Sequence, residues 1–129
     1  MLKNLLFLPI LSLIFSACSS TTPTNPNAPN VLEQHKNIAV EPETQHNIAR
    51  LIKQSNNCLI EFTGNFANGK ATEYWLFKNG ELLSAFSQVE ADTEQQRTVF
   101  DIQDPEKLKN FAALKNNFKA KNVEQCQSF

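Results

Sequence analysis

The pattern of apolar and polar residues predicts strands through the middle of the chain. Residues 58–62 alternate with a period of two, and three further runs are typical of β-strands: 72–78, 81–89 and 97–102. Asn79-Gly80, between the second and third runs, is the preferred pair for a two-residue type I′ hairpin. The pattern therefore predicts four antiparallel strands, with a tight turn between the second and the third.

An unbroken hairpin around Asn79-Gly80 would place Phe77 opposite Leu82 and, further from the turn, Trp75 opposite Ser84. Both faces of this hairpin would be substantially apolar, whereas a hairpin with one face in water alternates more cleanly. We therefore expect one face to pack on helices and the other to be covered by a loop or a partner.

Helical signals flank the strands on both sides. In residues 43–55, Ile48, Leu51 and Ile52 would share one face of a helix. A second helix would begin at Asp104-Pro105, with an aspartate N-cap and a proline at the first helical position. The apolar side of this second helix would consist of Leu108, Phe111, Ala112, Leu114 and Phe118.

These elements predict an α+β fold in one domain, residues 42–129: a four-stranded antiparallel meander packed with an N-terminal and a C-terminal helix. Residues 19–30 lack large apolar side chains and are typical of a flexible tether. Residues 31–41 are ambiguous, because they could extend the tether or add a short strand through Ile38 and Val40. We assign residues 18–41 to the tether.

The beginning of the chain has the order of regions of a secretory signal peptide: a positive charge, an apolar run and small residues. An uncleaved membrane anchor is the alternative, but the thirteen residues from Leu5 to Ala17 are fewer than the about 20 that a spanning helix needs. Ordinary signal peptidase prefers a small residue three positions before the cut. A cut after Ala17 would place bulky Phe15 there.

The run Phe15-Ser16-Ala17-Cys18 resembles the lipobox of bacterial lipoproteins, although Phe15 stands where that family usually has Leu. The resemblance implies removal of residues 1–17, a diacylglyceryl group on the Cys18 thiol and often a further acyl chain, such as palmitate, on the new amino group. Two or three such chains hold a protein stably on a membrane. The chain is therefore expected in the cell envelope. In a bacterium with two membranes, Ser19 after the cysteine implies the outer membrane, facing the periplasm.

Loss of residues 1–17 from the 129 would leave 112, enough for one small domain. The 12 basic and 13 acidic residues nearly balance, and an exported protein of this charge is not expected to bind nucleic acid. With Cys18 lipidated, Cys58 and Cys126 remain, and an oxidising compartment favours a disulfide between them. A redox or nucleophilic cysteine is the alternative, but the chain has no CxxC motif.

Known catalytic and cofactor motifs are absent from the sequence, so we expect no enzymatic activity, cofactor or metal. An acid–base pair could be drawn from Glu61, Glu73 and Asp101, but their spacing gives no support for it. His35 and His46 do not have metal-ligand spacing with any partner.

A possible interaction surface consists of Tyr74, Trp75, Phe77 and Phe86. Our leading interpretation is a non-enzymatic, lipid-anchored module that binds an envelope protein through its sheet or an exposed hairpin edge. The alternatives are a small cell-wall hydrolase or hydrolase inhibitor, and a carrier of a small apolar ligand held between sheet and helices.

Overall fold

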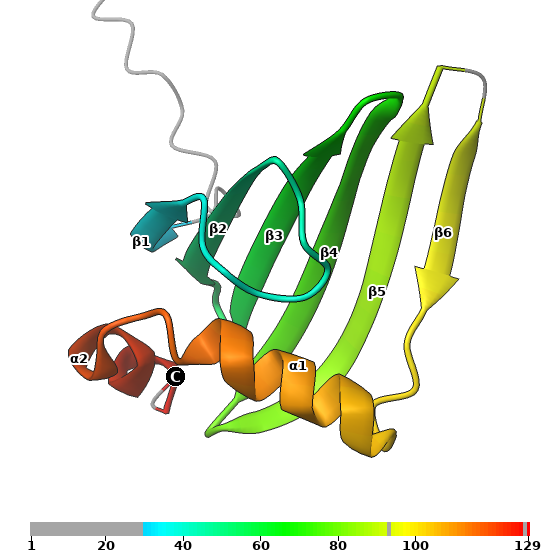
Figure 1. Cartoon of the computed structure of the whole chain (residues 1–129). Helices are drawn as coiled ribbons and strands as arrows, with labels where there is room; N and C mark the ends of the chain where they lie inside the picture. The colour runs from blue at the N-terminus through cyan, green and yellow to red at the C-terminus, as the bar shows by residue number, and fades with distance from the viewer. Residues whose placement is uncertain (1–29, 93, 128) are drawn as a thin grey trace, which may run out of the picture.

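The computed structural model describes residues 30–92, 94–127 and 129. Within this part of the chain, six strands form one antiparallel sheet in which each strand pairs with the next in sequence, from β1 at one edge to β6 at the other (Figure 1). The strands are β1 (Asn30–Lys36), β2 (His46–Lys53), β3 (Cys58–Phe66), β4 (Gly69–Lys78), β5 (Glu81–Ala91) and β6 (Gln95–Val99). The helices that follow are α1 (Pro105–Lys115), α2 (Ala120–Val123) and the 3-10 helix η1 (Glu124–Cys126).

One face of the sheet, which we call the inner face, is covered. α1 crosses it near the β4–β5 turn, and the β1–β2 loop crosses it further along β2–β4 (Figure 1). The Phe111 ring of α1 lies 5.3 Å from the Phe77 ring and 6.1 Å from the Trp75 ring, measured between centroids. The core therefore sits between α1 and the central strands. Its other buried members are Ala49, Leu51, Cys58, Ile60, Phe62, Leu82, Ala85, Leu114, Phe118 and Cys126.

The structure confirms an antiparallel sheet with a helix after it, but the sheet has six strands rather than the predicted four. The predicted strands are present as β3, β4, β5 and β6. β6 ends at Val99, so Phe100 and Ile102 lie in the connection to α1, where both pack partly buried against the core.

The helix predicted over residues 43–55 is wrong, because β2 occupies most of this segment. Ala49 and Leu51, two residues apart, are both 0% exposed and belong to the inner-face core. Their spacing of two is the period of a strand. A short apolar run such as this one fits a helical face and a strand equally well, and only tertiary packing distinguishes them.

The Asn47 side chain holds the β1–β2 loop in place at the start of β2. It accepts a hydrogen bond from the Ile38 N–H (2.8 Å) and donates to the Ile38 carbonyl (2.9 Å) and to Thr44 Oγ1 (3.2 Å). Thr44 in turn lies so close to Gly64 of β3 that a Cβ on that glycine would collide with it. The loop is thereby held against the inner face.

Residues 30–36, which we assigned to the tether, form β1 instead. The alternative of an additional strand in this region is correct, but the strand precedes Ile38 and Val40. Those two side chains lie in the β1–β2 loop and pack against the core. The folded part of the chain therefore begins earlier than the boundary predicted at residue 42.

The hairpin predicted at Asn79-Gly80 is confirmed, with the φ angles of +53° and +77° that a type I′ turn requires. The predicted register holds next to the turn and then shifts at a β-bulge. Trp75 consequently pairs with Ala85 rather than Ser84. An extra residue in one strand is the defining feature of a bulge, and the shift places a small side chain beside the buried indole.

α1 begins as predicted, because the Asp104 side chain accepts a hydrogen bond from the Glu106 N–H (3.0 Å). Its apolar side is narrower than predicted. Leu108 is 41% exposed and Ala112 is also exposed. The predicted apolar residues that are buried are Phe111, Leu114 and Phe118.

The predicted disulfide between Cys58 and Cys126 is confirmed, with an S–S distance of 2.04 Å. It joins the start of β3 to η1. The Asn79 N–H also donates to the Cys126 carbonyl (3.0 Å), so the C-terminal segment is fastened beside the β4–β5 turn as well.

Candidate functional site

The four aromatic residues predicted as an interaction surface do not lie together. Trp75 and Phe77 are 0% exposed and form the core beneath α1, so the prediction is wrong for these two. Tyr74 and Phe86 are half-buried on the opposite face of the sheet, which we call the outer face. Their rings are stacked, with 4.8 Å between centroids.

The outer-face aromatic pair continues to the edge of the sheet at β6. Val99 pairs with Phe86 and is 73% exposed. The Arg97 guanidinium carbon lies 4.0 Å from the centroid of the Phe86 ring, a cation–π contact. Val99, Phe86 and Arg97 thus present apolar area and one positive charge side by side.

β6 is the last strand of the sheet and pairs only with β5. All five of its side chains are exposed. The Phe100 N–H donates to the Ala85 carbonyl of β5 (2.9 Å), and the backbone groups of successive residues point to alternate sides of a strand. Every second residue back from Phe100 therefore faces β5. The residues whose N–H and C=O groups face away from the sheet are Gln95, Arg97 and Val99.

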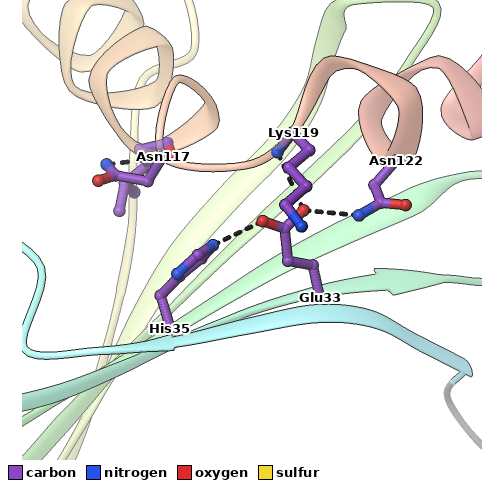
Figure 2. A network of polar contacts seen from close by, with 6 residues as sticks. Glu33, His35, Asn117, Lys119 and Asn122 are labelled. Atoms are coloured by element: carbon purple, nitrogen blue, oxygen red, sulfur yellow. Dashed lines mark hydrogen bonds and ion pairs between the residues drawn. The ribbon is translucent and has the colours of Figure 1, made fainter.

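The other edge of the sheet carries a partly buried polar network (Figure 2). The side chain of Glu33, in β1, is 9% exposed. One of its carboxylate oxygens lies 2.6 Å from His35 Nε2. Its second oxygen accepts hydrogen bonds from the Lys119 backbone N–H (2.9 Å) and from Asn122 Nδ2 (2.7 Å). The His35 ring also contacts Phe118, at 5.6 Å between centroids.

This network, which we call the clamp, holds the C-terminal segment to β1. Burial alone would raise the pKa of Glu33, but hydrogen bonds from Asn122, Lys119 and His35 outweigh burial and lower it. A carboxylate–imidazole pair also occurs in catalytic triads. Here the second carboxylate oxygen is bonded to the C-terminal segment, so the arrangement joins α2 to β1.

Glu73 occupies the inner face of β4, between Phe62 and Ser87 on the neighbouring strands. Its Oε1 and the Nε1 of Trp75, two residues further along the strand, are buried and make no hydrogen bond within the described residues. Burial raises the pKa of Glu73 to about 7, even though the charge of Lys107 acts to lower it. This carboxyl is therefore placed to exchange a proton near neutral pH.

The three candidate acid–base residues are not brought together as a pair. Glu61 lies on the outer face, where an oxygen is 3.8 Å from Arg50 Nη1, and Glu73 lies on the inner face. Asp101 follows β6 and accepts a hydrogen bond from the Gln103 N–H (2.9 Å). A sheet separates the first two carboxyl groups, which is not the geometry of a shared cleft.

Residues 30–92, 94–127 and 129 contain neither a metal-ligand cluster nor a membrane-spanning helix. No group of three or more His, Cys, Asp and Glu side chains is positioned there to hold a metal ion, and His46 is exposed at the start of β2. None of the helices in the same ranges combines the length and the apolar character needed to cross a bilayer. The predicted lipidation site, Cys18, lies outside the described residues.

Comparison of the chain with protein-family models, curated proteins and solved structures gives no significant match.

Sequence reasoning missed both edges of the sheet. It placed Glu33 in a tether and Val99 among the apolar residues of a fourth strand, whereas Val99 is largely exposed. One signal in the run 95–99 points to an edge: it holds two glutamines and Arg97 but few apolar residues, and charged side chains are common on edge strands.

Proposed function

We propose that this protein is a non-enzymatic interaction module of the cell envelope, anchored through lipid on Cys18, which binds another protein by adding an extended segment of that protein to β6. The observation that supports this proposal is the outward-facing backbone of β6, with the N–H and C=O groups of three residues directed away from the sheet. Strand addition satisfies such groups with main-chain hydrogen bonds.

The side chains beside this edge support the same role. Val99 and the Tyr74–Phe86 stack supply apolar area on which alternate side chains of an added strand would pack. Exposed edges are commonly blunted by charged side chains, proline or a bulge. β6 carries one charge, Arg97, but no proline, and its pairing with β5 is free of register shifts.

A lipid anchor fits a role in binding, because it confines the domain to the membrane surface where an envelope partner would lie. The direct check is Cys18→Ala in the full-length chain, which should leave unprocessed precursor and abolish membrane retention. Normal processing with release of the protein would contradict the anchor. The binding role would then be decided by the crosslinking test at β6.

The binding role is tested by site-specific photo-crosslinking in the native host. A photoreactive amino acid in place of Gln95 should give a discrete adduct with an envelope protein. The same probe in place of Lys36, an exposed residue of β1, serves as the matched control and should give none.

A second substitution separates strand addition from simple proximity. Val99→Pro removes one outward N–H but no hydrogen bond to β5. Proline is tolerated in edge strands where the N–H faces away from the sheet. It should abolish the Gln95 adduct, whereas Val99→Thr, which keeps the N–H, should preserve it. Equal adducts from Gln95 and Lys36, or an adduct that survives Val99→Pro, would contradict strand addition at β6.

A further inference from the structure

Building on the proposed function, we infer which kind of segment β6 accepts: an extended strand with a single acidic side chain opposite Arg97, flanked two residues away by apolar side chains, and not a second copy of this chain. Two features favour such a segment: the position of one charge in the edge strand, and the symmetry of strand pairing.

Arg97 is the middle residue of the five in β6. Its side chain is exposed on the outer face, over the Phe86 ring, and it forms no ion pair with any described carboxylate. An added strand would place a residue directly opposite Arg97, with about 5 Å between Cβ atoms. A carboxylate at that position gains a charge pair, while a lysine or arginine meets a like charge.

Self-pairing is disfavoured by the same residue. Two copies that join β6 to β6 in antiparallel fashion are related by a twofold axis perpendicular to the sheet, so each residue must face one whose side chain lies on the same face. In every register that pairs three or more β6 residues, Arg97 then faces Arg97, Gln95 or Val99 of the other copy. The two guanidinium groups become direct or diagonal neighbours, and like charges at these positions destabilise a pair.

Acidic residues at both ends of β6 restrict the partner to one central carboxylate. Glu90 pairs with Gln95 at one end of β6, and Asp101 follows the strand at the other. Glu90 is only partly compensated by Lys70, whose Nζ lies 3.4 Å away in an exposed pair. A run of acids in the partner would meet these charges, so apolar residues are favoured on either side of the central one.

The test uses three synthetic peptides with blocked ends: Thr-Val-Thr-Glu-Thr-Val-Thr and its variants with Gln or Lys at the centre. Their symmetric pattern presents the central residue and two valines on one face in either strand direction. We expect the Glu peptide to bind the mature protein about two- to fivefold more tightly than the Gln peptide, with the Lys peptide weaker by a similar factor. Amide NMR shifts should locate binding at Gln95, Arg97 and Val99.

Two variants isolate the charge. Arg97→Gln should remove the discrimination between the Glu and Lys peptides, and Arg97→Glu should reverse it, while NMR shows binding at the same amides. Higher salt should reduce the preference in the unmodified protein, because exposed charges are screened. Sedimentation of the unmodified protein should show a monomer.

The outcomes distinguish this inference from the proposed function. Peptide binding at β6 without a charge preference, or a dimer joined through β6, would overturn the acidic-partner inference; the first result would leave strand addition to β6 intact. Failure of all three peptides to shift the β6 amides overturns the inference, and the proposed function falls with it only if the Gln95 crosslink is also absent.

Discussion

The two edges of the sheet differ in how they end. At β1 a bulge interrupts the pairing, and the Glu33 carboxylate receives hydrogen bonds from Lys119 and Asn122 of the C-terminal segment. At β6 the pairing is regular, every side chain is exposed and no described element lies beyond it. The chain thus bonds its C-terminal segment to an inner-face side chain of β1, whereas no described segment is bonded to a side chain of β6. An open edge is a template for pairing with another chain.

The largest expected effect comes from releasing the C-terminal segment that is hydrogen-bonded to Glu33 of β1. The disulfide closes a loop with a sequence separation of 68, so replacing both Cys58 and Cys126 by alanine should lower the free energy of unfolding by about 4 kcal/mol. Urea denaturation measures the loss. Hydrogen exchange should accelerate at β1 and much less at the β6 amides bonded to β5. Equal acceleration at the two edges would remove the distinction between them.

Glu73, at the centre of the sheet, should make the stability of the protein depend on pH. The effects of variants at the two edges can be compared with this dependence. The pKa of Glu73 is raised from 4.5 to about 7 in the folded state, so the folded protein binds more protons than the unfolded chain between these values. Stability should therefore fall as the pH rises from 4.5 to about 7 and level off above it. Glu73→Gln removes this cost and should stabilise the protein at pH 8 by at most about 3 kcal/mol.

Denaturation curves at pH 5 and pH 8 measure the Glu73 effect. Glu61→Gln, on the outer face of the neighbouring strand, is the control and should alter the difference between the two curves far less. A Glu73→Gln variant with no greater advantage at pH 8 than at pH 5 would show that this carboxyl ionises freely in the folded protein.

Breaking the clamp at β1 should have the next largest effect. Glu33→Ala removes the acceptor of the exposed Lys119 N–H and of the half-buried Asn122 amide, and each lost hydrogen bond costs roughly 0.5–1.5 kcal/mol. The pKa of Glu33 is lowered in the folded state, so its contribution is present above pH 4.5 and is lost as the pH falls through the folded value. The pH trend is thus opposite in sign to that of Glu73.

Thermal or urea unfolding of Glu33→Ala is best measured beside Glu90→Ala, which removes only an exposed ion pair with Lys70 and should cost at most about 1 kcal/mol. Similar losses in the two variants would mean that the Glu33 network contributes no more than a surface contact.

The smallest effect is expected at β6. Arg97→Gln removes a cation–π contact from an exposed side chain, which contributes about 0.5–1 kcal/mol, and should change the free energy of unfolding by no more than that. Its effect should appear in partner binding instead. A loss of stability comparable to that of Glu33→Ala would indicate that Arg97 has a structural role and would weaken the contrast between the edges.

Local signals in the sequence predicted the parts of the fold that depend on local chemistry. Asn79-Gly80 specified its turn through two positive φ angles, and Asp104 specified the start of α1 through its cap. The disulfide was predicted from the number of cysteines and the expected oxidising compartment, and it is confirmed.

The features that depend on distant contacts could not be predicted in the same way. The apolar residues of β2 fit the period of a helix and that of a strand, and packing on the inner face decides between them. Glu33 reads as an ordinary polar residue in the sequence, and its role appears only when the chain brings it to Asn122, 89 residues away. The exposure of Val99 likewise depends on β6 being the last strand.

The order of the strands has a consequence for the kinetics of folding. Every pairing in the sheet joins consecutive strands, so each hairpin can form after a short loop closure, and such local contacts favour rapid folding. The bonds from Glu33 to Lys119 and Asn122 span 86 and 89 residues. We therefore expect the sheet to assemble first and the C-terminal segment to dock on β1 last, so that a newly folding chain passes through a state in which the Glu33 carboxylate lacks these two donors.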